Sequence, residues 1–575
     1  MPVETYVRSA ARFREHRGSA DRVLRDAGTL AFASLLEPAE TAGRDYLSVA
    51  ASKDTDDLAA LFRGDARQAV GFQHRGSRLA RVGYTARLID ALFAISLLAR
   101  GRVPGSLARR AVERYREMAA TDERHPYYGR VVRTATWTAL QYWFFYAFND
   151  WRSGFNGAND HEADWEQIMV YLDRDAEGNA VPIWAAYAQH DLHGRDLRRR
   201  WDDDAQLDLV DDHPVVYAGA GSHASYFRPG EYMAQQELRF PSALRRGINA
   251  VARLMNGTQS TGAEQVLGIA FVDYARGDGV VIGRGSERSW DPVLLDESQE
   301  WVAGYSGLWG LSVRDPFQGE DAPAGPMFNR DATVRLSWAD PIAFAELDSE
   351  PPPSQEVSLL RARAEATAAR QAELAATIPT FERELAATGA AGRGVSLSAA
   401  DLADSTAGHD RLGLELIDRH LERETNSLRL ADLRRRIAAA EAGERPAPQA
   451  HLRRIPAPRA PGVDRAGVIV ELWAAVSTGL LLLALVVALI LAPRFGLVAA
   501  ASVIALFVLV EAILRKRVVD LVVAWVRLLA IVGAAILVVR FWQLGVIAIA
   551  VGAGLFVLRE NVAELVSAAR SKGDA

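Results

Sequence analysis

Residues 141–172, QYWFFYAFNDWRSGFNGANDHEADWEQIMVYL, join an aromatic run to a Gly- and Asn-rich segment and then to a polar cluster. The residues that follow Glu166 are apolar and β-branched, which predicts a strand entering a core. Because side chains alternate between the faces of a strand, Asp164 and Glu166 are expected to point the same way. His161 stands three residues before Asp164, in the predicted turn. The segment therefore places carboxylates and an imidazole at the start of a buried strand.

These polar groups need a partner, because an unpaired charge at the edge of a core is costly. Oxygen donors with one nitrogen suit magnesium, calcium or manganese, so the cluster predicts a divalent cation, with calcium or magnesium favoured over zinc. His223, in GSHASY at 221–226, is expected to reach the same point from the loop after a strand at 214–217. In the alternative interpretation the carboxylates cap turns and His161 is a hydrogen-bonded surface residue. A zinc-protease helix is excluded, because Trp165 occupies the position of its second histidine.

The composition restricts the classes of function. A chain of 575 residues is too long for one hydrophobic core, so several domains are expected. The formal net charge of −6 argues against a nucleic-acid-binding protein, which needs a basic surface. The absence of cysteine excludes disulfides, thiolate nucleophiles and cysteine-ligated metals. The N-terminal sequence is charged and lacks the apolar segment of a signal peptide.

The first part of the chain is predicted to contain two regions. Residues 1–120 are expected to be a helical N-terminal region. Residues 121–349 are β-rich: apolar runs at 167–172 and 181–187 flank a turn-forming segment and predict a hairpin. Further short strands and late tryptophans favour a β-sandwich-like α+β domain with helical additions.

Residues 354–443 follow a stiff proline-rich linker and show helical spacing in two runs that are separated by a glycine-rich break. This pattern predicts a helical hairpin or a coiled-coil stalk, with a solvated and partly disordered linker as the alternative. Pro379 is expected to kink the first helix. Residues 444–465 are rich in proline and are expected to form an unstructured linker.

Residues 466–560 are predicted to be a block of about four transmembrane helices, followed by a polar tail at 561–575. Asp520 and Arg527 interrupt the third apolar stretch, so a block of three spans is the alternative. Arg527 is expected to reach an interface or to pair locally, with a conduction or lipid site as the alternative. The four stretches are 472–492, 495–514, 518–539 and 541–558.

The positive residues determine the expected topology. With four spans, both termini and the loop between the second and third spans share one side, and this side carries most of the Lys and Arg residues. The other side carries only Arg494 and Arg540. The positive-inside rule then predicts a multi-pass protein of the cell membrane, with its N-terminal domain and its C-terminus in the cytoplasm.

The polar cluster belongs to a set of motifs that resembles the vacuolar protein sorting-associated protein 62 family. The matching pieces are HEADWE at 161–166, HPVVY at 213–217, GSHASY at 221–226, GLWG at 307–310 and GP at 325–326. The order and chemistry of these pieces match along the β-rich region. The family has no well-established activity, so the resemblance names the domain and implies no reaction.

A more distant, local resemblance is to the necrosis- and ethylene-inducing cytolysins, which share His-x-x-Asp-Trp-Glu and an upstream Asp. In those proteins these residues hold a divalent cation on a β-sandwich that recognises membrane lipid headgroups. Residues 151–160 have no clear counterpart, which makes the upstream Asp the weakest match. Cytolysins are secreted and this sequence shows no signal peptide, so killing of host cells is not implied. Carried over by position, the implied ligands are Asp150, His161, Asp164 and Glu166, with His223 as a neighbour.

These observations lead to three functional hypotheses. The favoured one is a binding module: a membrane-anchored cytoplasmic protein whose β-sandwich-like domain holds a divalent cation and recognises a lipid headgroup, a glycan or a protein partner. The second is a metal-dependent hydrolase in which Glu166 or His223 acts as general base. The third is a structural or scaffolding protein that forms homo-oligomers through the stalk and the spans. The sequence lacks a nucleophile elbow, a phosphate-binding loop and a paired acid–base motif, which argues against an enzyme.

Overall fold

The computed structural model describes residues 1–15, 21–37, 44–49, 107–149, 161–189, 192–237, 268–296, 298–311, 322–391, 399–456, 465–491, 493–514, 516 and 518–573. The chain forms two compact units. Unit 1 comprises Met1–Gln73, Phe93–Gln235 and Ala270–Pro461, and unit 2 comprises His74–Leu92, Gln236–Ile269 and Gly462–Ala575.

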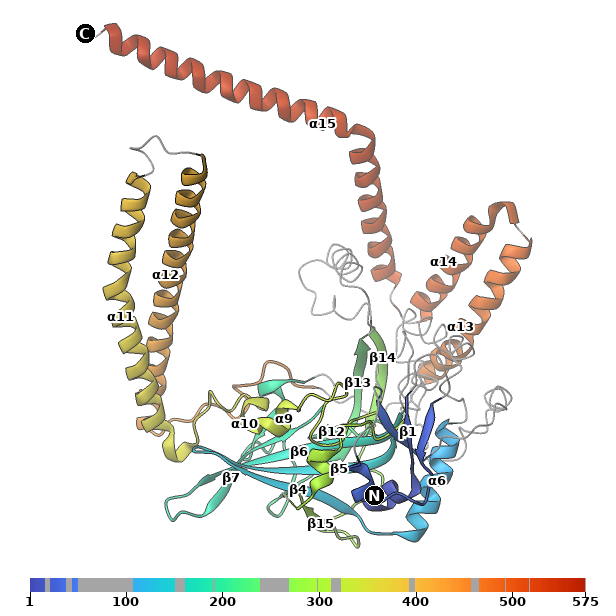
Figure 1. Cartoon of the computed structure of the whole chain (residues 1–575). Coiled ribbons are helices and arrows are strands. Elements are labelled where there is room, and N and C mark those ends of the chain that lie inside the picture. The colour runs from blue at the N-terminus through green and yellow to red at the C-terminus, as the bar shows by residue number, and fades with distance from the viewer. Residues whose placement is uncertain are drawn as a thin grey trace. The chain divides into compact units, whose positions relative to one another are not determined.

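A six-stranded sheet is the largest element of unit 1 (Figure 1). Its order is β15-β4-β5-β6-β7-β8. β15 pairs with β4 in parallel, and all other neighbours are antiparallel. The strands are β4 (Pro126–Arg133), β5 (Thr138–Asn149), β6 (His161–Arg174), β7 (Ala180–Tyr187), β8 (Arg198–Arg200) and β15 (Asp291–Leu294).

The alternating sequence of β5 determines which face of the sheet forms the main core. Trp143, Phe145 and Ala147 are buried, and the residues between them are partly exposed. The ring of Phe145 lies 4.9 Å from that of Trp165 on β6 and 6.0 Å from that of Trp309. Burying one such ring contributes about 1.5–3 kcal/mol. This aromatic cluster therefore fixes the ends of β5 and β6 against the segment that contains Trp309.

Two smaller clusters cover β6 and β7. Tyr187 stacks on Phe227 with ring centroids 3.9 Å apart, and Ile168 packs beside them. Tyr171 packs with Ile342, and its hydroxyl donates a hydrogen bond to a backbone carbonyl at 2.7 Å. The long β6 is thus buried on both faces, which explains why its sequence is apolar without strict alternation.

The N-terminal part of unit 1 contains strands as well as helices. β1 lies between β2 and β3 in an antiparallel sheet, and the buried carboxylate of Asp45 on β3 pairs with Arg12 and Arg14 on β1. The described residues of 1–120, predicted to be helical, therefore combine helices with a small sheet, because these four-residue strands are too short to give a period-2 signal. The elements are α1 (Val3–Ser9), β1 (Ala11–Arg14), β2 (Arg22–Arg25), α2 (Phe32–Leu35), β3 (Asp45–Ser48) and α6 (Leu107–Thr121).

Short elements connect the larger ones, and six of the strands form three two-stranded sheets. In the described part of the chain no second sheet has a size comparable with the six-stranded one, so the arrangement differs from the predicted β-sandwich-like domain. The paired strands are β9 (Leu209–Val210) with β10 (His213–Pro214), β11 (Tyr217–Ala218) with β12 (Ser225–Tyr226), and β13 (Gly230–Glu237) with β14 (Gly268–Ala275). The short helices are η2 (Gly194–Leu197), α8 (Glu300–Gly304), α9 (Leu336–Ala339), α10 (Pro341–Phe344) and η4 (Pro353–Gln355).

Two long helices, α11 (Glu356–Ala391) and α12 (Ala399–Glu441), lie side by side as a hairpin (Figure 1). Their apolar side chains are buried between them, including Leu374 and Ile378 on α11 and Leu433 on α12. Arg370 and Glu422 link the helices through an ion pair of 2.7 Å. α11 continues past Pro379 as one helix.

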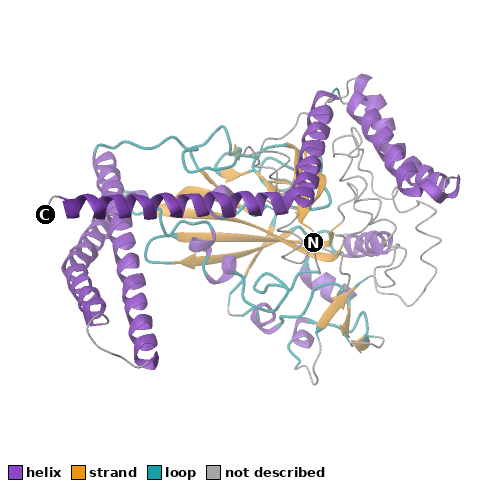
Figure 2. Cartoon of the chain, turned by 90° about the horizontal axis from the view of Figure 1, so that it is seen from above, coloured by secondary structure: helices purple, strands orange, loops and turns teal. Residues whose placement is uncertain are grey.

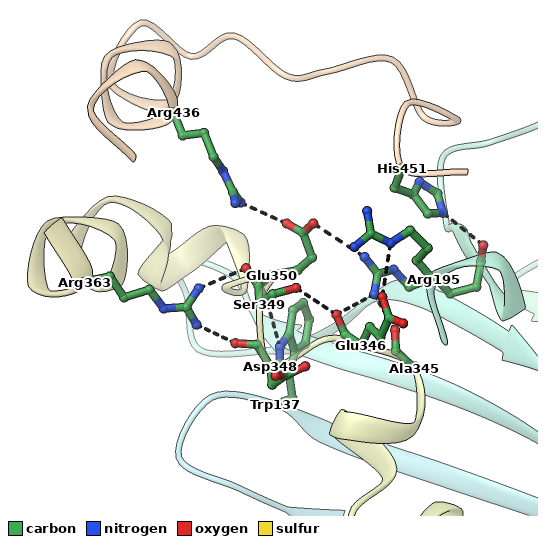
Figure 3. A network of polar contacts seen from close by, with 11 residues as sticks. Trp137, Arg195, Ala345, Glu346, Asp348, Ser349, Glu350, Arg363, Arg436 and His451 are labelled. Carbon is green, nitrogen blue, oxygen red and sulfur yellow. Dashed lines mark hydrogen bonds and ion pairs between the residues drawn. The ribbon is translucent and has the colours of Figure 1, made fainter. Parts of the chain in front are cut away.

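The segment that follows α12 lies against the sheet rather than forming the predicted unstructured linker. Arg200 on β8 donates a hydrogen bond to the carbonyl of Pro446 at 2.7 Å, and His451 bonds the carbonyl of Arg198 at 3.1 Å. Figure 3 shows the adjoining network, in which Glu350 pairs with Arg436 of α12 at 3.0 Å. Residues 444–456 are thus held by polar contacts that proline content does not reveal.

Unit 2 contains the helices α13 (Arg465–Leu491), α14 (Gly496–Leu514) and α15 (Val518–Gly573), with the short η5 (Pro493–Phe495) between the first two (Figure 2). Trp473 of α13 donates a hydrogen bond to the carboxylate of Glu511 on α14 at 2.6 Å, and its ring lies 5.5 Å from that of Phe507. These contacts join the two helices.

The predicted transmembrane block at 466–560 is wrong. None of the helices in the described ranges combines the length and the apolar character needed to traverse a bilayer. The predicted turn near Arg540 is also replaced by continuous helix, because α15 runs from Val518 to Gly573 and carries Asp520, Arg527 and Arg540 along its length. The predicted multi-pass location in the cell membrane, and the topology derived from the positive residues, depended on these spans and are therefore wrong as well.

Candidate functional site

The site is built where β5 ends and β6 begins. The two strands are antiparallel neighbours, so Tyr146 pairs with Asp164 and Asn149 pairs with His161. His223 approaches from the loop between β11 and β12. Its Nδ1 lies 3.0 Å from Asp164 Oδ2. The structure therefore brings together Asp164 and His223 from the predicted set.

Hydrogen bonds define the chemical state of this pair. Asp164 Oδ2 accepts from Asn149 Nδ2 at 2.9 Å and from His223 Nδ1 at 3.0 Å. A carboxylate only accepts, so His223 carries its proton on Nδ1 and presents Nε2 as an acceptor when the ring is neutral. Burial by itself would raise the pKa of Asp164, but the hydrogen bond from His223 and the nearby imidazole of His161 hold it below its ordinary value.

Tyr146 fixes the plane of the imidazole. Its ring stacks on His223 with centroids 3.9 Å apart and an angle of 7° between the planes. Burial raises the pKa of Tyr146 above its ordinary value, and the carboxylates of Glu166 and Asp164 raise it further. The phenol therefore stays neutral. Glu166 itself is partly exposed and lies opposite Phe144 in the β5–β6 register.

The loop that carries His223 is anchored to β14. Asp273 Oδ2 accepts from Ser222 Oγ at 2.6 Å and from the hydroxyl of Tyr226 at 2.8 Å. A Cβ on Gly219 would lie 2.3 Å from Asp273 Oδ1, so this position requires glycine. His223 itself adopts φ 60°, an uncommon conformation for a residue with a side chain. The anchored loop holds this strained backbone so that the imidazole faces Asp164.

Two acceptors at this site have no partner among the residues that the structure describes. Asn149 Oδ1 is buried without a hydrogen bond. His223 Nε2 receives none from any described residue, and the side chain of His223 keeps 16% of its surface exposed. Buried polar atoms normally find a partner, so an unsatisfied one beside a partly exposed imidazole calls for an explanation.

The side chain of His161 forms a hydrogen bond with the neighbouring backbone. It is buried, and its Nδ1 lies 2.7 Å from the carbonyl of Ala163, which can only accept, so Nδ1 carries the proton. Ala163 has φ 57°, a left-handed conformation that interrupts the alternation of β6. The sequence predicted a turn at His161 before the strand, but β6 already begins at His161 and is distorted at Ala163. Asp150, the remaining predicted ligand, lies outside the described residues.

Glu162, to which the sequence pattern assigned no role, is fully buried. Its Oε1 accepts from Ser48 Oγ at 3.0 Å and from Val49 N at 2.9 Å, and its Oε2 accepts from Leu311 N at 3.0 Å. A Cβ on Gly310 would lie 2.4 Å from the carbonyl of Glu162. Glu162 thus joins β3, β6 and the segment after Trp309. No spacing rule distinguishes such a carboxylate from its neighbours.

The described side chains do not gather as the predicted divalent-cation site requires. Among the described residues no three His, Asp or Glu side chains converge so that they could hold a metal ion. In the described structure Nδ1 of His161 and Nδ1 of His223 act as hydrogen-bond donors, and Asp164 Oδ2 accepts two hydrogen bonds. The metal-binding character expected from the sequence therefore has no such group behind it in the described part of the chain. The individual ligands Asp150, His161, Asp164, Glu166 and His223 stay predictions, with Asp150 outside the described residues.

No family model, no curated protein and no solved structure matches this chain. The resemblances to the vacuolar protein sorting-associated protein 62 family and to the cytolysins therefore stay predictions.

Proposed function

We propose that the β-domain of unit 1 is a recognition module that binds a hydroxyl-rich ligand, a neutral glycan, at the site formed by Asn149, Asp164 and His223. The observation that supports this most directly is the pair of acceptors, Asn149 Oδ1 and His223 Nε2, that lack a partner in the described structure. A ligand that supplies hydrogen-bond donors would satisfy both.

The charge of the site favours a neutral donor over an anion. Asp164 and the nearby Glu166 are carboxylates, and both influence the adjacent Tyr146 electrostatically. A phosphate or carboxylate on a ligand would be repelled by them. Sugar hydroxyls both donate and accept, so they can supply the donors that this pair of acceptors lacks.

Asp164 provides the rigidity that a recognition site needs. It fixes the proton of His223 on Nδ1 and holds the amide of Asn149, so both acceptors are oriented before a ligand arrives. Orientation in advance reduces the entropy that binding costs. The module therefore needs no bound ion to arrange its groups.

The proposal is tested with the full chain on an array of neutral oligosaccharides, followed by calorimetry on any ligand found. His223→Ala and Asn149→Ala should each weaken binding by about tenfold or more, since each leaves a ligand hydroxyl unpaired. His213→Ala is the matched control, because His213 is exposed and its side chain pairs with the exposed Asp212. Absence of saccharide binding, or equal losses in the control, would refute the proposal.

A second candidate, a hydrolase, is favoured by one observation. An aspartate on Nδ1 of a histidine whose Nε2 is available is the arrangement of a general base. Ser222 cannot serve as the nucleophile in this geometry, because its hydroxyl donates to Asp273 instead. Such an enzyme would activate water with His223. Turnover of a bound saccharide that is lost in His223→Gln would favour this candidate over simple recognition.

A further inference from the structure

An apolar stripe runs along the outer face of α12. Leu414, Ile417, Leu421 and Leu428 have exposed fractions of 66%, 55%, 56% and 70%. Their spacing of three, four and seven residues is that of the a and d positions of a heptad. We call these four residues the α12 stripe. At 1.5 Å per residue the stripe is about 21 Å long.

The stripe is distinct from the face of α12 that packs on α11. That inner face buries Leu433 and most of Leu430, and Glu422 on it pairs with Arg370 of α11. Arg419 lies over the ring of Phe381 of α11 at 4.0 Å. The hairpin is therefore complete without the stripe, and α12 carries two apolar faces where a two-helix hairpin uses one.

We propose that the α12 stripe binds the same stripe of a second copy of this chain, with the two α12 helices antiparallel. Each copy contributes one helical hairpin, so the pair forms a four-helix arrangement of a common kind. Such an interface is self-complementary and closes as a dimer.

The charges at the two ends of the stripe favour the antiparallel orientation. Asp410 and Arg411 precede it, and Asp432 and Arg435 follow it. If Ile417 faces the partner's Leu428, the same register places Asp410 opposite the partner's Arg435. The flanking Arg411 then lies near the partner's Asp432. A parallel pair would instead place each of these charges beside an identical one, which is unfavourable.

One residue in the stripe's path opposes association. Glu424 is exposed and stands at the d position between Leu421 and Leu428. In the antiparallel register it faces the partner's Leu421, so pairing removes part of its hydration without a counter-charge. Glu424→Leu should therefore tighten the dimer by about tenfold. A polar residue at one such position is a known means of fixing register at a cost in stability.

Sedimentation velocity on the full chain tests the interface. The double variant Leu421→Glu/Leu428→Glu should shift the protein toward the mass of one chain, and Glu424→Leu should shift it toward twice that mass. Ala376→Glu, at an exposed position of α11, is the matched control for an added charge on the hairpin. Identical sedimentation of all four proteins would overturn the proposal.

Cysteine cross-linking tests the orientation, because the chain contains no cysteine of its own. Leu414 and Ala431 are partners in the antiparallel register, so a mixture of Leu414→Cys and Ala431→Cys chains should form a mixed disulfide. Leu414→Cys alone should form none. A disulfide between two Leu414→Cys chains would overturn the antiparallel pairing, and failure of the mixture to cross-link would overturn the interface itself.

Discussion

Asp164 Oδ2 and His223 Nδ1 are 3.0 Å apart although the two residues are 59 positions apart in the chain. This hydrogen bond joins β6 to the loop between β11 and β12, and it determines which nitrogen of His223 is available to a ligand. The same carboxylate holds Asn149 on β5. A single side chain therefore organises three segments of the proposed recognition site.

Replacing Asp164 tests this organising role. Asp164→Asn keeps the shape but removes the charge and turns one acceptor oxygen into a donor. A hydrogen bond to a charged group contributes about 1.5–3 kcal/mol, so we expect a loss of that size in the free energy of unfolding, measured with urea. Asp212→Asn, which removes only an exposed pair with His213, should have little effect. Equal stability of Asp164→Asn and the wild type would show that the pair is not formed in solution.

The contribution of Asp164 should also depend on pH. Its pKa in the folded protein is below that of an ordinary aspartate, about 3.9, so the unfolded state binds the proton first as the pH falls. The stabilisation is fully present above about pH 4 and is lost as the pH falls through the lowered pKa. The difference in unfolding free energy between wild type and Asp164→Asn should therefore shrink below pH 4. A difference that grows on acidification would contradict this assignment.

Glu162 should matter more for stability than any other residue of the cluster. Its two oxygens accept three hydrogen bonds in a fully buried position. Glu162→Gln would place an amide N–H group against a donor, which costs roughly 3 kcal/mol or more through an unsatisfied buried group. Thermal melting of the variant checks this. Glu166→Gln is the matched control at a partly exposed position, and a larger loss there than at Glu162 would contradict the interpretation.

Part of the site could be predicted from the sequence. The features that could not be predicted depend on distant hydrogen-bond partners and on the backbone conformation of single residues. Asp164 and His223 could be paired because each stands beside a strand-like run. Glu162 could not be identified, since its partners Ser48 and Leu311 are distant in the chain and offer only backbone or hydroxyl groups. Ala163 in a left-handed conformation could not be foreseen either, because alanine carries no preference for it.

The larger errors concern whole segments of the chain. Apolar runs predicted membrane spans, but run length does not show where a helix ends, and α15 continues through Arg540. Proline content predicted an unstructured linker, yet the carbonyl of Pro446 and the ring of His451 find partners on β8. The docking of this segment depends on tertiary contacts that the segment itself does not encode.

Chelation should leave the protein unaffected. Asn149, Asp164 and His223 are held to one another by hydrogen bonds in the structure, so the cluster is stabilised without a bound cation. We expect the melting temperature of the full chain to be the same with and without EDTA. A lower melting temperature in EDTA that calcium or magnesium restores would show that the cluster rearranges into a metal site.

His451 should make the docking of residues 444–456 sensitive to acid. Burial lowers the pKa of His451 below the ordinary 6.5, and the guanidinium groups of Arg198 and Arg199 lower it further. The hydrogen bond to the Arg198 carbonyl and the carboxylate of Glu350 act in the opposite direction and raise it. The folded state therefore favours neutral His451. Its stabilisation is complete above about pH 6.5 and is lost as the pH falls toward the lowered pKa, because the unfolded state takes up the proton first.

His451→Phe tests this directly, since it keeps an aromatic ring against Trp184 but cannot titrate. The variant should lose the hydrogen bond to Arg198, at a cost of about 0.5–1.5 kcal/mol at pH 7.5. Its melting temperature should then fall less steeply than that of the wild type between pH 6.5 and 5. His213→Phe, at an exposed histidine, should keep the wild-type slope. If His451→Phe and wild type show parallel pH profiles, His451 does not couple the docked segment to protonation.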